Sequence, residues 1–427
     1  MSNVKAPSDS PRVILKPGAI SALPEILSAE GIRSVFLFAD TSTYAAAGEC
    51  VISSLAGAEI ATKKYIFTEE HTEPDEAAVG LAVMHLDPSV DAVIAVGSGV
   101  INDISKIVAN LSGKKYIVVA TAPSMDGYAS ATSSMSVRGL KISLPSKCAD
   151  IIVGDTEILR NAPMKMMISG LGDMLAKYIA ICEWRISHII NGEGYSAEVA
   201  DMVRASLKRC VDNAEELLAR DADAVEAVFD GLVLCGLAMK LAGTSRPASG
   251  IEHYLSHIWD MRGGEFGTKT DLHGLQCAVG TYISASLYER IKNTTPDREK
   301  ALEYVKSFDY SEWKHKMKEF LGKGADAMIA LEEKEGKYDK EKHSARLDRI
   351  IEKWDEILAV IDEEIPSVEC LSALYRRVGL PMSMEELGLD VDLLPLTFKA
   401  AKDIRDKYVL PRLCFDLGII EEITEKD

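Results

Sequence analysis

Three histidines lie close together in the sequence, in segments that predict two successive helices. His253 and His257 are four residues apart in IEHYLSHIWDM and therefore share one helix face, and His273 begins the next predicted helix. Asp173 lies in the first turn of another predicted helix, after GLG. Imidazole and carboxylate groups suit zinc, nickel or ferrous iron. Each histidine alone could equally be packed in a core. The H-E-x-x-H protease signature is absent, because Tyr254 follows His253.

A glycine-containing turn follows the apolar run AVIAV and opens a predicted helix. Such a turn lets the backbone pass close to a ligand, and the helix N-terminus offers N–H groups to an anion such as a pyrophosphate. The third glycine of G-x-G-x-x-G is replaced by Asn102, and no P-loop sequence follows. A tight turn without a ligand is the alternative. The residues of this turn are Gly97, Ser98, Gly99, Val100, Ile101, Asn102 and Asp103.

A polar loop, Thr121–Ser130, leaves the end of another apolar run. Its hydroxyl groups could bind phosphate or amide groups, and its carboxylate, Asp126, could accept hydrogen bonds from substrate hydroxyls. A simple Asp-Gly turn is the alternative. Asp40 ends the earlier run SVFLFAD, where an acid can bind the adenosine ribose, although it could also be only a helix cap.

The elements around these residues predict two kinds of structure. Short apolar runs at residues 34–40, 92–97 and 115–122 alternate with helical patterns, which predicts a mostly parallel sheet. A hairpin is expected around Arg138–Gly139, followed by one more strand in CADIIVGD. Helical periodicity dominates after about residue 161. We therefore expect an α/β nucleotide-binding domain at residues 1–160 and an all-α domain at residues 161–427.

Composition excludes some classes of function. The chain has 427 residues and a formal net charge of −18, which disfavours nucleic acid and an anionic membrane surface as partners. No apolar run reaches the length of a membrane span, and the eight cysteines form no C-x-x-C pair. We expect a reduced cytoplasmic protein. The charged stretch 297–361 receives no functional role.

The chain resembles the dehydroquinate synthase-like and iron-containing alcohol dehydrogenase superfamily. The matching motifs are AVGSGVINDISK, TAPSMDGYAS, GLGDMLAK, SRPASGIEHYLSHIWDM and LHGLQCAVGT, which fall in the family's order from about Ser34 to Thr281. Within the superfamily the chain resembles the sn-glycerol-1-phosphate dehydrogenases of the bacterial, arabinose-operon type. The resemblance implies a dehydroquinate synthase-like fold and a homodimer.

The resemblance also implies roles for individual residues. Asp173, His253 and His273 would hold a catalytic metal. Asp126, Asp173 and His257 would contact substrate. The dinucleotide, NAD or possibly NADP, would contact Asp40, the turn Gly97–Asp103, Thr121, Ala122, Pro123, Ser124 and Ser130. Lys177 stands where the iron enzymes carry a fourth ligand, a histidine, so the metal is expected to be zinc or nickel.

The implied reaction is reversible reduction of dihydroxyacetone phosphate to sn-glycerol 1-phosphate. Glycerol dehydrogenase, a dehydroquinate synthase-like lyase and a non-catalytic binding protein are the alternatives. Arg246 in TSRPASG could add a cation near a phosphate, or it could be an ordinary exposed arginine.

Overall fold

The computed structural model describes residues 10–69, 72–138 and 140–425. These residues form two compact units. Unit 1 comprises residues up to Met174 together with Asp201–Thr244, and unit 2 comprises Leu175–Ala200 and the residues from Ser245 onward. The predicted division after residue 160 differs from this grouping, because residues 161–174 and 201–244 fall in unit 1. The predicted boundary between folding domains stays a prediction.

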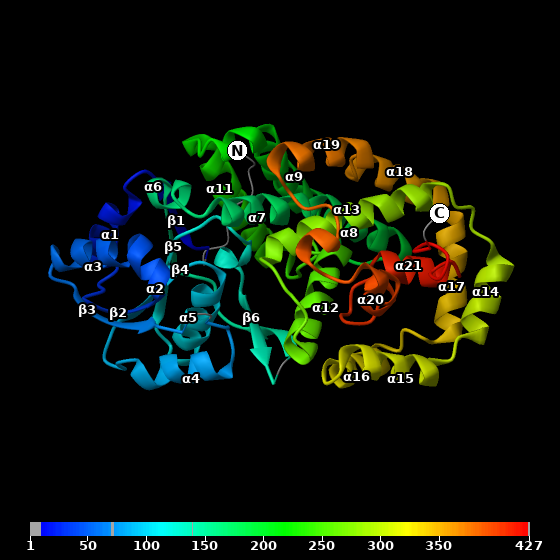
Figure 1. Ribbon diagram of the computed structural model, residues 1–427, viewed down its shortest axis with the longest axis horizontal. Helices are drawn as coiled ribbons and strands as arrows, with labels where there is room; N and C mark the ends of the chain where they lie inside the picture. Colours follow the sequence, from blue (N-terminus) through cyan, green and yellow to red (C-terminus); the bar gives the residue numbers. More distant parts are fainter. Residues whose placement is uncertain (1–9, 70–71, 139, 426–427) are drawn as a thin grey trace. The chain divides into compact units, whose positions relative to one another are not determined.

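A six-stranded parallel sheet forms the centre of unit 1 (Figure 1). Its strand order is β1-β8-β5-β4-β2-β3. A separate two-stranded antiparallel hairpin pairs β6 with β7. The strands are β1 (Arg12–Lys16), β2 (Ser34–Asp40), β3 (Ala61–Phe67), β4 (Ala92–Gly97), β5 (Lys115–Ala120), β6 (Thr132–Val137), β7 (Leu140–Pro145) and β8 (Ile151–Asp155). The predicted strands and hairpin are confirmed, although Gly139 at the hairpin tip lies outside the described residues.

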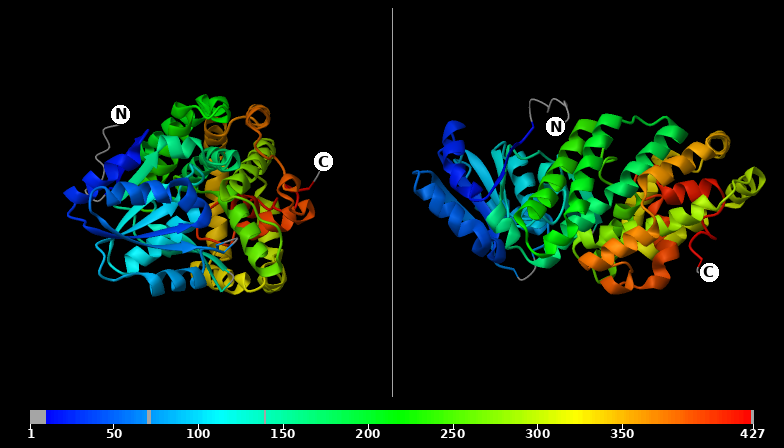
Figure 2. Two further views of the ribbon diagram at one scale, coloured as in Figure 1. Left: turned by 60° about the vertical axis from the view of Figure 1, so that its left-hand side comes forward. Right: turned by 90° about the horizontal axis from the view of Figure 1, so that it is seen from above.

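Helices pack on the sheet of unit 1. Apolar side chains of α1 and α3 form one buried core with alternate residues of the central strands, among them Val35, Leu37, Ile94 and Val119. Helix α5 packs on β4 and β5 and also contacts α4. Figure 2 shows the parallel sheet of unit 1 and its helices from two further directions. The helices of this unit are α1 (Leu23–Ala29), α2 (Thr41–Thr43), α3 (Glu49–Ala56), α4 (Glu76–His85), α5 (Gly99–Leu111), α6 (Thr156–Arg160), α7 (Met164–Leu175, whose last residue is assigned to unit 2), α9 (Ala197–Asp212, whose first four residues are assigned to unit 2), α10 (Ala214–Leu218) and α11 (Ala222–Ala242).

Unit 2 is helical throughout its described residues, as predicted. Its helices are α8 (Lys177–Asn191), α12 (Ile251–Phe266), α13 (His273–Lys292), α14 (Arg298–Ser307), α15 (Tyr310–Leu321), α16 (Gly324–Glu335), α17 (Lys340–Glu352), α18 (Trp354–Glu364), α19 (Val368–Val378), α20 (Leu394–Ala401) and α21 (Leu410–Asp416). The charged stretch 297–361 forms α14 to α17 and most of α18. In the described part of the chain, no helix combines the length and apolar character needed to cross a membrane.

Candidate active site

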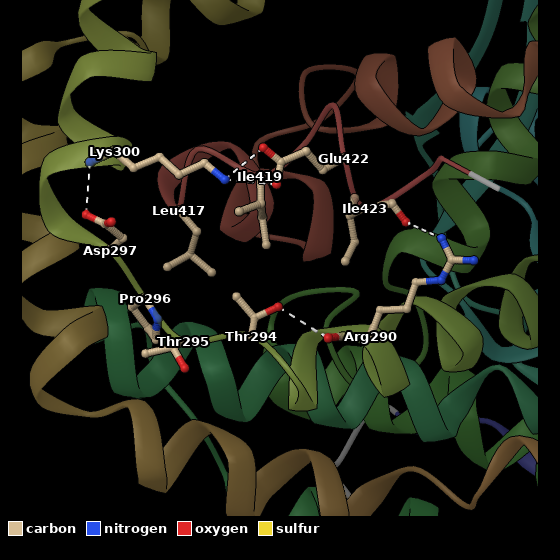
Figure 3. Close-up of a pocket in the computed structure, with 10 residues that line it drawn as sticks. All are labelled: Arg290, Thr294, Thr295, Pro296, Asp297, Lys300, Leu417, Ile419, Glu422 and Ile423. Atoms are coloured by element: carbon tan, nitrogen blue, oxygen red, sulfur yellow. Dashed lines mark hydrogen bonds and ion pairs between the residues drawn. The ribbon is translucent and has the colours of Figure 1, made fainter. Parts of the chain in front are cut away.

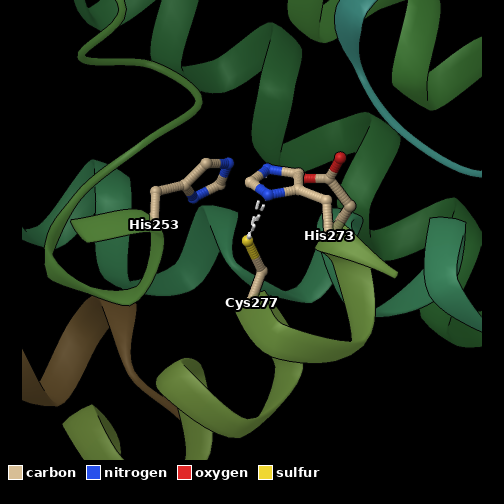
Figure 4. Close-up of side chains that lie close together, drawn as sticks. His253, His273 and Cys277 are labelled. Atoms are coloured by element: carbon tan, nitrogen blue, oxygen red, sulfur yellow. Dashed lines mark hydrogen bonds between the residues drawn. The ribbon is translucent and has the colours of Figure 1, made fainter. Parts of the chain in front are cut away.

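Helices α12 and α13 of unit 2 bring the three clustered histidines together. His253 and His257 lie one turn apart on α12, and His273 is the first residue of α13. The ring centroids of His253 and His273 are 5.0 Å apart (Figure 4), and those of His257 and His273 are 6.0 Å apart and nearly parallel. The helix face predicted from the spacing of four therefore meets the start of the next helix.

A buried carboxylate orients the ring of His253. Glu252 Oε1 lies 2.8 Å from His253 Nδ1 and also accepts a hydrogen bond of 2.6 Å from the backbone N–H of Gly250. Because the carboxylate oxygen can only accept, Nδ1 is the donor, and in the neutral ring the lone pair is on Nε2. This carboxylate–imidazole arrangement is typical of a histidine that ligates a metal through its other nitrogen.

A second polar chain reaches the ring of His273. Ser256 Oγ lies 3.1 Å from His273 Nδ1, and Gln276 Nε2 donates to Ser256 Oγ at 3.1 Å. The same Gln276 nitrogen donates to Asp260 Oδ1 at 2.8 Å. Ser256 and Gln276 are fully buried, so their bonds hold the ring in a fixed place with its Nε2 on the opposite side.

Cys277 lies close to the two imidazoles, and the sequence analysis did not predict this contact. Its Sγ lies 3.5 Å from His273 Nε2, and the candidate ligand atoms of His253, His273 and Cys277 all lie within 4.8 Å of one another (Figure 4). The available signal was spacing: Cys277 follows His273 by four residues and therefore shares its helix face.

These side chains fit a divalent metal of intermediate softness. Two imidazole nitrogens and one sulfur are the ligands that zinc, nickel and ferrous iron prefer over magnesium or calcium. Both histidines have Nδ1 engaged by a neighbour, which leaves Nε2 as the ligand atom.

Asp173 lies in the last turn of α7 in unit 1, not at the start of a helix as predicted, and contacts the polar loop predicted to bind substrate. Its Oδ2 accepts a hydrogen bond of 2.9 Å from the backbone N–H of Asp126. Ser169 Oγ donates to Ser124 O at 3.1 Å, one turn earlier on the same helix. A Cβ at Gly170 would lie 1.9 Å from Pro123 O, so only glycine permits this approach. Two predicted substrate residues, Asp126 and Asp173, are therefore neighbours.

The predicted cofactor residues lie along one edge of the sheet. Strands β2, β4 and β5 run parallel, so Asp40, the turn Gly97–Asp103 and the loop Thr121–Ser124 follow neighbouring carboxyl ends. After β2 the chain continues outward to β3, whereas after β4 it continues to β5 on the other side. Such a switch in direction is where α/β sheets bind ligands.

The glycine turn is shaped by close packing. A Cβ at Gly97 would lie 2.7 Å from the Cβ of Ile101 in α5. The buried hydroxyls of Ser98 and Ser124 bond to each other across β4 and β5. Ser98, the N-cap residue of α5, makes no side-chain cap hydrogen bond, and the N–H groups of such a helix N-terminus can bind an anion.

Three predicted cofactor residues also have structural partners. Asp40 caps α2, since its Oδ1 accepts from Thr43 N at 2.7 Å. Asn102 is buried, and its Oδ1 accepts from Tyr116 OH at 2.9 Å. Asp103 Oδ2 accepts from Ser134 N at 3.2 Å, and burial raises the pKa of the Asp103 carboxyl. Their contacts with a cofactor stay predictions.

Arg246 is neither exposed nor available to a phosphate. Its side chain is 1% exposed, and its Nε and Nη2 donate to the two carboxylate oxygens of Glu193 at 2.8 and 2.6 Å. Its Nη1 donates to Tyr408 O at 2.9 Å. The guanidinium therefore joins separate segments of unit 2.

A cavity of about 330 Å³ lies in unit 2, away from these residues (Figure 3). Its cations have partners: Lys300 Nζ donates to Glu422 Oε1 at 2.7 Å and Arg290 donates to Ile423 O at 2.9 Å. None of the predicted site residues lines it. The lining residues are Arg290, Thr294, Thr295, Pro296, Asp297, Lys300, Leu417, Ile419, Glu422 and Ile423.

Residues 14–163 match the iron-containing alcohol dehydrogenase family. The glycerol-1-phosphate dehydrogenase [NAD(P)+] of Halalkalibacterium halodurans is 30% identical over 395 residues, covering 92% of this chain and 89% of that protein. The enzyme of the same name from Geobacillus thermodenitrificans is 28% identical and covers the same shares of the two chains.

Solved structures share the fold at low identity. A probable glycerol dehydrogenase from Sinorhizobium meliloti gives a TM-score of 0.60 at 16% identity, covering 97% of each chain. Maleylacetate reductase from Agrobacterium tumefaciens gives a TM-score of 0.63 at 15% identity, covering 98% of this chain and 97% of that one. With a relative at 30% identity along almost the whole length, the chain belongs to the glycerol-1-phosphate dehydrogenase family.

Proposed function

We propose that this protein catalyses the metal-dependent, reversible reduction of dihydroxyacetone phosphate to sn-glycerol 1-phosphate with NADH or NADPH. The observation that carries the proposal is the pair of imidazoles on α12 and α13, whose Nδ1 atoms contact Glu252 and Ser256 and whose ligand atoms lie within 4.8 Å of one another. Two histidines that were only packed in a core would not need to bring their second ring nitrogens close together. Family membership supplies the reaction.

Asp173, His253 and His273 are proposed to hold one divalent ion, zinc or nickel. Bound there, such an ion supplies a Lewis acid that polarises the ketone oxygen and stabilises the alkoxide that develops. Glu252 fixes the orientation of the His253 ring through its hydrogen bond, and Ser256 fixes the rotation of His273. The protein groups thus determine where the carbonyl oxygen is held.

The carboxyl edge of the sheet in unit 1 is proposed to bind the dinucleotide. The uncapped N-terminus of α5 offers backbone N–H groups to the pyrophosphate, and the hydroxyls of Thr121, Ser124 and Ser130 offer further hydrogen bonds. Asp40 follows β2, the neighbour of β4, which is a suitable place to accept hydrogen bonds from ribose hydroxyls.

Asp126, Asp173 and His257 are proposed to orient the substrate. The hydrogen bond from Asp126 N to Asp173 Oδ2 fixes the backbone of the loop against α7, next to the Asp173 carboxylate. Hydride transfer would require the substrate carbon to face the nicotinamide while the ketone oxygen lies at the metal site. We also propose that the protein is a homodimer located in the cytoplasm.

The decisive experiment measures NADH oxidation by the full-length protein loaded with zinc or nickel. Net oxidation on addition of dihydroxyacetone phosphate is expected. A dehydroquinate synthase-like lyase recycles its cofactor and a binding protein turns nothing over, so absence of net oxidation with either metal and either cofactor would contradict the proposal.

A further inference from the structure

We propose that Cys277 is a further ligand of the metal, bound through its thiolate sulfur. This inference rests on the proposed function, because it concerns the same ion, and it adds a residue that the histidine and aspartate set does not contain. Cys277 lies on α13, one turn after His273, and is fully buried. Its Sγ and the ligand atoms of His253 and His273 lie within 4.8 Å of one another.

The distance between the Cys277 sulfur and the nearer His273 nitrogen matches the distance between two ligand atoms bound to one ion. With a zinc–nitrogen distance of about 2.05 Å and a zinc–sulfur distance of about 2.3 Å, tetrahedral geometry separates the two ligand atoms by about 3.6 Å. The Sγ of Cys277 lies 3.5 Å from His273 Nε2 and 3.9 Å from Nδ1. The sulfur is thus closer to Nε2 than to Nδ1, the nitrogen that contacts Ser256.

The other buried cysteines of unit 2 differ from Cys277 in their surroundings. Burial raises the pKa of the Cys182 and Cys414 thiols, and neighbouring carboxylates raise it further. Neither belongs to a group of candidate ligands in the described residues. Cys277 faces two imidazoles instead, and these are the partners with which a thiolate shares zinc.

Binding of the metal by the Cys277 sulfur requires the thiol to lose its proton. The incoming ion displaces the thiol proton, which passes to solvent, and the sulfur lone pair forms the metal bond. With Asp173 and the two histidines the protein would supply four ligands, and a catalytic zinc sometimes accepts a fifth. A soft sulfur also favours zinc over manganese or magnesium.

The test uses the full-length protein with its metal replaced by cobalt(II). A sulfur-to-cobalt charge-transfer band in the near ultraviolet is expected in the unaltered protein and in Cys414→Ala, the matched variant of an equally buried cysteine. The band is expected to disappear in Cys277→Ala and Cys277→Ser while cobalt still binds. Zinc affinity in these two variants should fall about 10-fold or more. Thermal unfolding followed by circular dichroism checks that the variants fold.

The outcomes separate the two proposals. Suppose that cobalt binds to the unaltered protein without the charge-transfer band, and that His253→Ala abolishes this binding. That result would overturn the role of Cys277 and would leave the proposed metal site standing. Cobalt binding that is unaffected by both His253→Ala and His273→Ala would overturn the metal site, and Cys277 with it. The first result needs no cysteine variant, so the inference remains falsifiable if Cys277→Ala does not fold.

Discussion

His253 and His273 carry the most direct prediction at the scale of single residues. His253→Ala and His273→Ala are each expected to lower kcat more than about 100-fold, because even outer partners of a metal ligand are worth about 10- to 100-fold. Bound zinc, measured by elemental analysis, should fall in parallel while circular dichroism stays unchanged.

The matched control for the histidine variants is His315→Ala, whose exposed ring contacts only Glu319 among carboxylates. It should retain metal and activity. Full turnover by metal-free protein, or by either ligand variant, would show that the imidazoles are structural.

Asp40 tests whether one residue serves both as helix cap and as ribose ligand. Its side chain accepts from Thr43 N, and a carboxylate there would also repel the 2′-phosphate of NADPH. Asp40→Ala is therefore expected to lower the preference for NADH over NADPH, measured as the ratio of kcat/KM values. Loss of the cap alone costs about 1 kcal/mol.

Asp75→Ala separates the two roles of Asp40, because Asp75 caps α4 through the N–H of Ala78. It should lose similar stability without any change in cofactor preference. If Asp40→Ala behaves identically to Asp75→Ala, Asp40 is only a cap.

At the scale of elements, the contact of α7 with the polar loop depends on Gly170. Alanine there would bring its Cβ within 1.9 Å of Pro123 O, a backbone atom that cannot move without displacing the loop. Gly170→Ala is expected to destabilise the protein by about 1–3 kcal/mol, the usual range for overpacking, and to raise KM. Chemical denaturation and steady-state kinetics measure the two effects.

Gly80→Ala provides the comparison for Gly170→Ala. Gly80 lies inside α4 with open space around it, so alanine there should stabilise the helix by about 0.5–1 kcal/mol. Equal effects of the two substitutions would mean that α7 does not fix the loop.

Glu183 of α8 connects the beginnings of two other helices. Its Oε2 accepts from Ile251 N of α12 at 2.8 Å, and its Oε1 accepts from Leu410 N of α21 at 2.7 Å. Burial, followed by the charge of Glu252, raises the pKa of the Glu183 carboxyl to about 8. Because the unfolded pKa is lower, the folded state binds the extra proton, and stability from this group is lost as pH rises towards 8.

The unaltered protein should therefore lose stability relative to Glu183→Gln between about pH 5 and pH 8, by at most about 1.4 kcal/mol per pH unit. The free energy of unfolding of both proteins, measured across this range, gives the difference. Glu363→Gln, an exposed glutamate on α18, should show no such slope against the unaltered protein. A parallel pH dependence of Glu183→Gln and the unaltered protein would refute the assignment.

The elements that the sequence predicted differ physically from those it did not. Strands β2, β4, β5 and β8 lie inside the sheet and are apolar on both faces, so they stand out as continuous apolar runs. The unpredicted strands β1 and β3 form the two edges. They carry Arg12, Lys16, Lys63 and Lys64. Such charges prevent an exposed edge from pairing with another chain, but they also interrupt the apolar run by which a strand is recognised in the sequence.

The candidate site, too, could be predicted from the sequence only in part. His253 and His257 were recognisable because one helix face is encoded by a spacing of four. The roles of Cys277 and Ser256 depend on how α12 packs against α13, which no local pattern encodes. Arg246 was proposed as a phosphate contact or an exposed arginine, and the long-range bond to Glu193 that excludes both arises only in the folded chain.

At the scale of the whole molecule, the formal net charge of −18 opposes an anionic substrate at long range. Preference for a phosphorylated ketone must therefore come from short-range donors in the site. Arg246 is engaged by Glu193, so backbone N–H groups and hydroxyls are the expected donors. One hydrogen bond to a charged group contributes about 1.5–3 kcal/mol, equivalent to about 10- to 100-fold in binding.

We therefore expect dihydroxyacetone phosphate to be reduced with a kcat/KM at least about 10-fold higher than that of dihydroxyacetone. A phosphate remote from the reacting carbon adds binding energy that orients the ketone, so the gain should appear in kcat as well as in KM. Parallel assays with the two ketones at fixed NADH measure the ratio, and a stereospecific assay should identify the product as the sn-1 phosphate. Preference for the unphosphorylated ketone would instead indicate a glycerol dehydrogenase, and an sn-3 product would contradict the proposed reaction.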